Sequence, residues 1–302
     1  MSKKSDRLRK NAIAFAESGS PKTDRVRPKR DLRPVVVRSF EGTPSECDWV
    51  ALRELVPSAS APLKLRDKKY ADRTITLASV LPSAAPALVR DNGEILIAAQ
   101  TTIPSPDPGR DIAHALVQAL DAEPGAVLPY QSAAADGPTL PELLSDEPLT
   151  ITVHQDFGFW VEDLESQSAE VKASMKNANE TVFPTARLTS VQAAYWCAPG
   201  PKAHVRWPMP YAEDELLIAL ARIAAAGELH LGEDTRFAGQ FRVHGLLVPV
   251  WDVPIDAHQD EFEEPARAMQ AKIEAALAID EPLNDAERRS RAGIIGRQVT
   301  LR

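Results

Sequence analysis

The chain has 302 residues, of which 44% are hydrophobic, 26% charged and 6% aromatic, the composition of a globular protein with one large domain or two of about 150 residues. Its two cysteines, Cys47 and Cys197, are far apart in sequence, which argues against a disulfide framework and against clustered zinc ligands. No segment resembles a signal peptide or approaches the roughly 20 apolar residues of a membrane span, so we expect a cytoplasmic protein without membrane contact.

The net charge of −8 is divided unevenly along the chain. Residues 1–38 carry 12 Lys and Arg against 4 Asp and Glu, a net charge of +8, so the other 264 residues carry 23 against 39, a net charge of −16. Residues 1–34 also contain few large apolar side chains, which predicts a basic arm that is disordered on its own. A basic arm before an acidic body indicates contact with an anionic partner.

The body is predicted to begin with a strand, "PVVVRSF" at 34–40, followed by a helix. Thr43 and Glu46 have the spacing of a capping box, and the helix should end near Val56 because Pro57 disfavours helical geometry before it. Cys47 lies on the apolar stripe of this helix between two acids, so we interpret it as a buried side chain and not a reactive thiol.

Two strands and a helix are expected next. The strands are "TITLASV" at 74–80 and "EILIAAQ" at 94–100, and Asn92-Gly93 before the second strand is a hairpin turn signal. Asp107 is the expected N-cap of a helix whose apolar face includes Ile112 and Leu116. Residues 126–148 are rich in small and turn-forming residues, which predicts a linker.

The remainder of the chain contains the same kinds of element. Strands are expected at 149–154 and 157–163, a helix near 167–179, a hairpin made by "AAYWC" and "KAHVRWP", a helix at 212–226 that ends at Gly227, and a strand pair at 239–254 bent at Gly245. Two C-terminal helices follow, one with Pro265 in its first turn and one capped by Asn284 and Glu287.

Helices mixed with antiparallel hairpins, without βαβ regularity, predict an α+β fold. Segments 86–121 and 192–226 share the order hairpin, loop, helix, which is compatible with an old duplication. We therefore expect two related β-hairpin-plus-helix subdomains and C-terminal helices behind a disordered basic arm. The predicted division is arm 1–34, first subdomain 35–125, linker 126–148 and second subdomain 149–302.

Motifs for common chemistry are absent: the sequence contains neither a phosphate-binding glycine loop nor a GxSxG nucleophile elbow. We predict no cofactor and no metal. Three side chains remain as an alternative hydrolytic site, His154, Asp156 and His230, provided that the fold brings them together. His154 and Asp156 share one side of a strand because side chains alternate with period two. Structural or surface roles for these residues are the competing interpretation.

Two sets of residues are candidates for binding. Aromatics on strands with arginines nearby can stack bases or hold a peptide, although such aromatics also form ordinary cores. The candidate groove residues are Trp160, Trp196, Arg206, Trp207 and Trp251. Mobile cations of the arm can neutralise phosphates, or they can serve only as a solubilising tail. The candidate nucleic-acid-binding residues are Arg7, Arg9, Lys10, Arg25, Arg27, Lys29, Arg30 and Arg33.

Several long stretches, among them "FEGTPSECDWVALRELVP", "AYWC" and "ERRSRAGIIGRQVTLR", resemble an uncharacterised actinobacterial domain-of-unknown-function family over roughly residues 35–302. The resemblance implies no established activity. Some relatives carry an N-terminal SEC-C zinc motif and the label preprotein translocase SecA-like, which implies a link to the secretion machinery. This chain has no cysteine before Cys47, so the resemblance does not extend to that motif.

These observations favour a non-enzymatic cytoplasmic binding or adaptor protein whose basic arm contacts RNA or the ribosome, or a protein partner. A hydrolase without a recognised motif and a secretion-associated factor are the alternatives.

Overall fold

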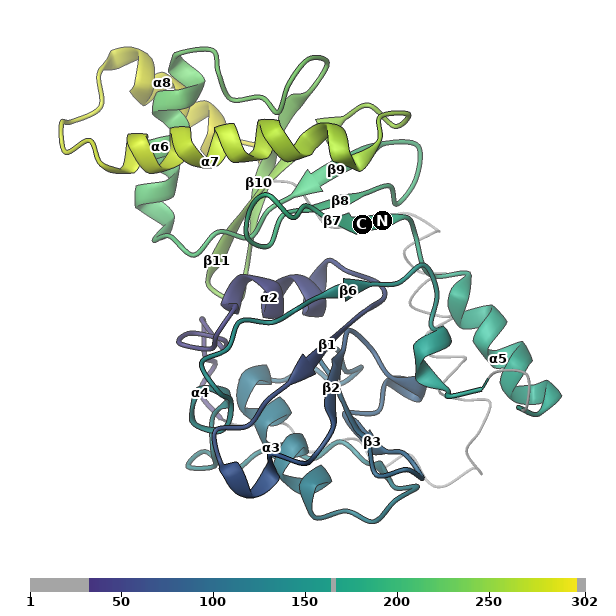
Figure 1. The fold of residues 1–302 in the computed structure, drawn as a ribbon. Coiled ribbons are helices and arrows are strands. Elements are labelled where there is room, and N and C mark those ends of the chain that lie inside the picture. The colour runs from purple at the N-terminus through teal and green to yellow at the C-terminus, as the bar shows by residue number, and fades with distance from the viewer. Residues whose placement is uncertain (1–32, 164–166, 298–302) are drawn as a thin grey trace. The chain divides into compact units, whose positions relative to one another are not determined.

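A computed structural model describes residues 33–163 and 167–297 (Figure 1). Within these ranges the protein is α+β, as predicted, and it contains two β-sheets and seven α-helices. Among these helices none has the length and apolar character that crossing a membrane requires. The described chain forms two compact units: the first comprises 33–45 and 57–182, and the second comprises 46–56 and 183–297.

The first unit contains a six-stranded sheet in the order β5-β3-β4-β2-β1-β6. Its strands are β1 Ala59–Leu63, β2 Ile75–Ala78, β3 Ala87–Val89, β4 Ile95–Ala98, β5 Val127–Leu128 and β6 Thr152–Val153. The Asn92-Gly93 turn joins β4 to β3 in an antiparallel hairpin, and Gly93 has the positive φ of 86° that such a turn needs. The strand predicted at 74–80 is β2, and it pairs with β4 in parallel.

Helices cover this sheet. They are α3 Pro108–Leu120, α4 Leu140–Leu143 and α5 Ala169–Asn179, with short 3₁₀ turns η1 Lys68–Tyr70, η2 Pro82–Ala84 and η3 Gly158–Trp160. As predicted, the Asp107 side chain caps α3 by accepting from the Arg110 N–H. Strand β4 is buried along its whole length, with Leu96 in a cluster that includes Trp160 and Met175. A strand covered on both faces is rich in branched apolar residues, as "ILIA" is.

The second unit contains a five-stranded antiparallel sheet in the order β10-β11-β9-β8-β7. Its strands are β7 Thr185–Arg187, β8 Tyr195–Cys197, β9 Ala203–Arg206, β10 Arg236–Val243 and β11 Leu246–Val253. The two predicted hairpins, β8-β9 and β10-β11, are both present. His244 and Gly245 both have positive φ, the backbone of a tight two-residue hairpin turn.

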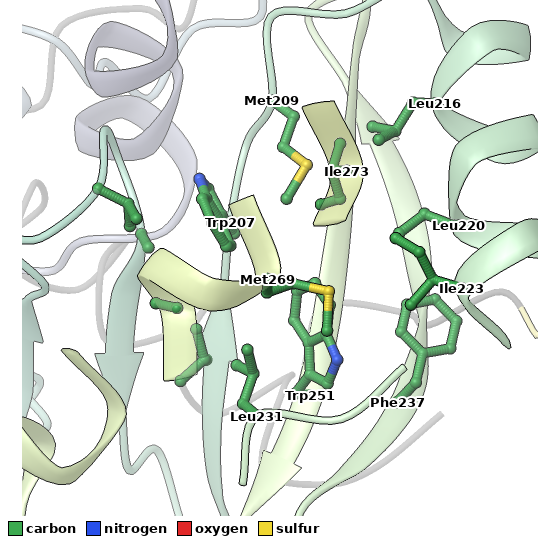
Figure 2. Close-up of a cluster of buried hydrophobic side chains, with 14 of the residues drawn as sticks. Trp207, Met209, Leu216, Leu220, Ile223, Leu231, Phe237, Trp251, Met269 and Ile273 are labelled. Carbon is green, nitrogen blue, oxygen red and sulfur yellow. The ribbon is translucent and has the colours of Figure 1, made fainter. Parts of the chain in front are cut away.

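Three helices pack on one face of this sheet: α6 Glu213–Ala225, α7 Glu263–Leu277 and α8 Asp285–Ile295. Trp207 and Trp251 extend from the sheet side into the same buried cluster as Met269 and Ile273 of α7 (Figure 2). The predicted capping box of Asn284 and Glu287 opens α8. This cluster is the hydrophobic core of the second unit.

Helix α2, Glu46–Glu54, also belongs to the second unit although it lies early in the sequence. The Asp48 carboxylate is 1% exposed and accepts a hydrogen bond from the Tyr195 hydroxyl at 2.7 Å and two from Arg187. Burial, and then the nearby Asp48 charge, raise the pKa of Tyr195 well above its ordinary value. Cys47 is buried and is not part of a disulfide, as the sequence predicted.

Some local predictions were wrong. Thr43 and Glu46 form no capping box: the helix begins at Glu46, and the buried Thr43 hydroxyl has no hydrogen-bond partner among the described residues. Residues 34–40 form no strand, and Val35 and Val37 are 75% and 73% exposed, because no neighbouring strand pairs with them.

Other segments differ from the prediction in type or extent. The expected strand at 157–163 is the 3₁₀ turn η3, and the strand at 149–154 is shortened to β6, which pairs with β1 in the first sheet. The stretch predicted as a linker, 126–148, contains β5 and α4, and Leu140 of α4 is buried.

Candidate functional site

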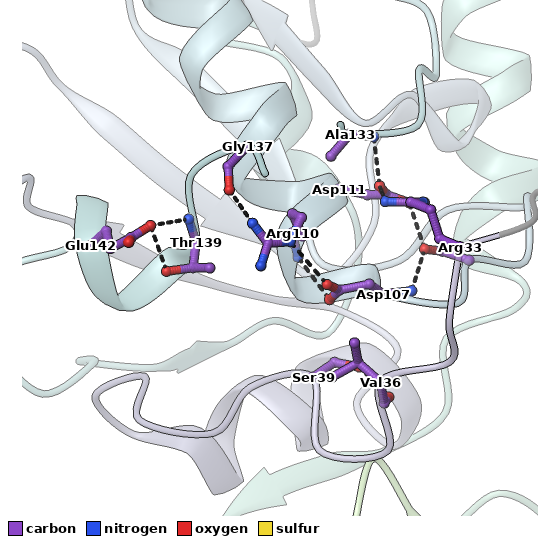
Figure 3. A network of polar contacts seen from close by, with 11 residues as sticks. Arg33, Val36, Ser39, Asp107, Arg110, Asp111, Ala133, Gly137, Thr139 and Glu142 are labelled. Carbon is purple, nitrogen blue, oxygen red and sulfur yellow. Dashed lines mark hydrogen bonds and ion pairs between the residues drawn. The ribbon is translucent and has the colours of Figure 1, made fainter. Parts of the chain in front are cut away.

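The last residue of the predicted nucleic-acid-binding set, Arg33, is held by a buried carboxylate of the first unit (Figure 3). Its guanidinium donates to both Asp111 oxygens, at 2.8 and 3.1 Å, and the Arg33 side chain is only 13% exposed. Asp111 also accepts from the Ser105 hydroxyl at 2.5 Å, the Tyr130 hydroxyl at 2.7 Å and the Ala133 N–H at 2.9 Å. Burial raises the pKa of Asp111, but these donors outweigh it and hold that pKa below its usual value.

The segment after Arg33 rests against the N-terminal end of α3. Val36 donates its N–H to the Pro106 carbonyl at 2.8 Å. A Cβ atom on Gly109 would lie 2.0 Å from the Ser39 carbonyl oxygen, so only glycine fits at this position. Arg33 and residues 36–39 therefore fix the point at which the arm joins the body.

The other seven residues of that set lie outside the described residues. They are Arg7, Arg9, Lys10, Arg25, Arg27, Lys29 and Arg30.

His154, of the predicted hydrolytic set, is hydrogen-bonded to a residue that the sequence did not single out. Its Nε2 lies 2.8 Å from the Ser60 hydroxyl, and its ring stacks on Phe159 with centroids 4.6 Å apart. Burial lowers the pKa of His154, and the charge of Asp156 only partly opposes this, so the ring is neutral at pH 7. The pairing of Ser60 with Thr152 at the β1–β6 edge sets this contact, and no local motif signals it.

The rest of the hydrolytic set is divided between the two units. Asp156 uses Oδ1 to accept the Gly158 N–H at 2.7 Å, and His230 is an exposed residue of the second unit. Over the ranges that the structure describes, no cluster of three or more His, Cys, Asp or Glu side chains is arranged to hold a metal ion.

The five candidate groove residues are divided between the two units, and in the second unit they lie on both faces of the sheet. Trp160 is buried in the first unit, where its Nε1 donates to the Val80 carbonyl. In the second unit, Trp196 and Trp251 both pair with Val205 and so share the helix-covered face, where Trp251 is fully buried. Trp207 is buried in the same core.

Arg206 points to the opposite face because it is adjacent to Val205 on β9. The aromatic and cationic side chains therefore do not alternate on one surface.

The face that carries Arg206 also holds a row of polar side chains across adjacent strands. Arg236, Asp252, His204 and Cys197 are consecutive cross-strand partners on β10, β11, β9 and β8. Asp252 accepts from His204 Nδ1 at 3.0 Å and from Arg236 at 2.8 Å. Burial raises the pKa of the Cys197 thiol to about 11, so this cysteine is a protonated core residue and not a nucleophile.

Two cavities lie within single units. One of about 190 Å³ in the first unit is lined by residues that include Pro62, Lys64, Leu144 and Glu147. The other, of about 50 Å³ in the second unit, has Trp207 in its wall. The larger cavity is small for an organic ligand, since such sites usually exceed about 300 Å³.

These features define an α+β protein whose two units each combine a sheet with packed helices, preceded by a cationic segment. The chain belongs to a family of unknown function, DUF5926, whose family model matches residues 39–302. The expected relationship to a domain-of-unknown-function family is thus confirmed for this range. Comparisons with curated proteins and with solved structures found no match. The family match begins immediately after the basic stretch 1–38.

Proposed function

We propose that this is a non-enzymatic cytoplasmic binding protein that contacts an anionic partner, RNA or the RNA of a ribosome, through its basic arm. The observation that carries the proposal is the division of charge, +8 over residues 1–38 and −16 over the remainder. Lysine and arginine side chains bind nucleic-acid phosphates by releasing condensed counterions.

Ion pairing in the body supports this assignment. Many cations of the body already face a carboxylate, as in Arg90–Glu94, Arg187–Asp48, Arg242–Glu213, Arg291–Asp214 and Lys272–Glu228. Because acids outnumber bases in residues 39–302, the surplus positive charge of the protein lies in the arm. The Arg33–Asp111 pair ties the C-terminal end of that arm to the first unit.

The test is RNA and ribosome co-sedimentation across a salt series. Deleting the whole arm would also remove Arg33 and unpair Asp111, so the sharper variant replaces the other seven residues of the candidate nucleic-acid-binding set with glutamine in the full-length chain. For contact with six phosphates of single-stranded RNA, the logarithm of the binding constant falls with the logarithm of the salt concentration at a slope of about −4. We expect binding with such a slope for the unmodified protein and its loss in the variant. Equal binding by both proteins would refute the role of the arm.

One contact favours a second candidate function, a hydrolase. Ser60 and the neutral His154 have the hydrogen bond of a nucleophile and its general base. In such a reaction Ser60 Oγ adds to an ester carbonyl carbon while its proton passes to His154 Nε2. The ester C–O bond then breaks and the leaving alcohol takes that proton. A water molecule, deprotonated by His154, finally hydrolyses the acyl-serine to a carboxylic acid and restores the Ser60 hydroxyl. A fluorophosphonate probe would then label the protein at Ser60, and Ser60→Ala would abolish the adduct in intact-mass spectra. An unlabelled native protein would rule this function out.

A further inference from the structure

Arg206 is a half-buried cation that has no counterion among the residues the structure describes. In the part of the chain that the structure describes, no carboxylate lies within ion-pair distance of its guanidinium, although most arginines of the second unit have one. Its cross-strand partners are Val250 and Tyr195, and the Tyr195 hydroxyl is already bonded to Asp48. A partly desolvated guanidinium is costly unless an anion faces it.

The surroundings of Arg206 add positive charge. Lys202 and Arg236 lie around the adjacent His204–Asp252 pair, and their side chains are 65% and 72% exposed. Asp252 accepts hydrogen bonds from His204 and Arg236, at 3.0 and 2.8 Å, and forms an ion pair with Lys202 at 3.6 Å. Two exposed cations, Lys202 and Arg236, therefore share one carboxylate beside Arg206, in a body whose overall charge is strongly negative.

His204 can contribute a further donor. A carboxylate only accepts hydrogen bonds, so Nδ1–H donates to Asp252 and Nε2 carries the lone pair when the ring is neutral. Burial and the charge of Arg206 lower the pKa of His204, Lys202 lowers it further, and Asp252 raises it. An anion bound at Arg206 would offset these cations and favour a second proton on the ring.

We propose that Arg206, flanked by His204, Lys202 and Arg236, binds a phosphate group of an RNA backbone. The inference rests on the proposed RNA-binding function and adds a contact on the second unit to the contacts of the arm. A planar guanidinium with several parallel N–H donors matches the oxygens of a phosphate, and the flanking exposed cations attract a polyanion.

The test measures fluorescence anisotropy of a labelled single-stranded oligouridine with the full-length protein across a salt series. Arg206→Gln should weaken binding and make the log–log slope shallower by about 0.7, the value for one lost phosphate contact on a single strand. The matched control is Arg267→Gln, which removes the same charge from α7 on the helix side of the sheet and should leave the slope unchanged. Arg206→Lys keeps the charge and should restore the slope with weaker affinity.

A second readout follows His204 by NMR with and without the same RNA. The RNA should raise the pKa of His204 in the unmodified protein and less so in Arg206→Gln. If Arg206→Gln misfolds, as judged by its melting curve, Arg206→Lys and the histidine titration still decide the question.

The two proposals fail separately. If the seven-fold arm variant loses binding while Arg206→Gln binds like the unmodified protein, the Arg206 site is overturned and the arm stands. If the arm variant keeps its affinity and Arg206→Gln loses it, the arm is refuted and the Arg206 site stands. Absence of RNA binding by the unmodified protein overturns both.

Discussion

Each unit contains one buried carboxylate that accepts hydrogen bonds from an arginine and a tyrosine. In the first unit Asp111 gathers four donors from loops around the start of α3. In the second unit the described residues that donate to Asp48 of α2 are two strand residues, Arg187 and Tyr195, and Arg187 lies 139 positions away in sequence. The same chemistry thus secures a set of loops in one unit and a helix–sheet contact in the other.

The two sites differ in whether water can reach the donor groups once the carboxylate is removed. The Arg33, Ser105 and Tyr130 side chains around Asp111 are only partly buried, so water can replace some of the lost bonds. Tyr195 is fully buried beneath α2 and would keep an unsatisfied hydroxyl. We therefore expect the second unit to be the more sensitive to loss of its carboxylate.

The largest effect is expected for Asp48→Ala. The change leaves the Arg187 guanidinium and the Tyr195 hydroxyl unpaired beneath α2, and breaking a buried ion pair costs about 3–5 kcal/mol. Urea denaturation followed by circular dichroism would measure the lost free energy of unfolding. Glu46→Ala, in the first turn of the same helix, is the control for helix propensity. A loss below about 1 kcal/mol would contradict the proposed importance of this contact.

Asp111→Asn should lower the free energy of unfolding by a smaller amount, about 1.5–3 kcal/mol. Each hydrogen bond to a charged group contributes that much, and the amide keeps part of the network. The pKa of Asp111 is lower in the folded than in the unfolded protein. Its contribution is therefore complete above the unfolded value of about 4 and is lost as the pH falls through the folded value.

Acid titration of the unfolding free energy checks this second point. Stability of the unmodified protein should fall more steeply below about pH 4 than stability of Asp111→Asn. If the free energy of unfolding fell equally steeply in acid for the two proteins, the charge of Asp111 would not contribute to stability.

The smallest change in stability is expected at Gln240 on β10, and here the substitution should stabilise the protein. Its side chain is fully buried, and neither its amide nitrogen nor its amide oxygen has a partner among the described residues. Gln240→Leu removes this unsatisfied polar group at similar size and should raise the melting temperature, with a gain of about 1–2 kcal/mol. The backbone N–H of Gln240, which donates to the Arg297 carbonyl, is unaffected by the change. A lower melting temperature would reveal a polar partner for this amide.

Elements with strong local signals could be predicted from the sequence. The capped helix α3, the helix α6 that ends at a positive-φ Gly227, and the β10–β11 hairpin all depend on residues a few positions apart. Asn92-Gly93 marked a turn correctly, but a turn does not say which earlier strand becomes the partner. The missed strand β3 has only three residues, and besides its local hairpin with β4 it pairs with β5, which is distant in sequence.

Little of the candidate site was predictable for the same reason. The Ser60–His154 contact spans 94 residues and follows from strand register. The separation of Arg206 from Trp207, by contrast, has a local cause, because adjacent side chains of an extended segment face opposite ways. The alternation in "AHVRW" is therefore the signal in the sequence that distinguishes this arginine from the buried tryptophans.

The assignment of α2 to the second unit has a consequence for synthesis. The chain enters the second unit at residue 46, leaves it after 56 and returns at 183, so the ribosome completes the whole first unit while α2 is still without its sheet. During this interval Asp48 of the helix lacks its partners Arg187 and Tyr195, which lie on strands that are not yet synthesised. The first unit can fold as its residues emerge, whereas the second must wait for the C-terminal strands. An expression fragment that starts near residue 183 would lack one of its own helices and should be insoluble unless residues 46–56 are supplied as a peptide.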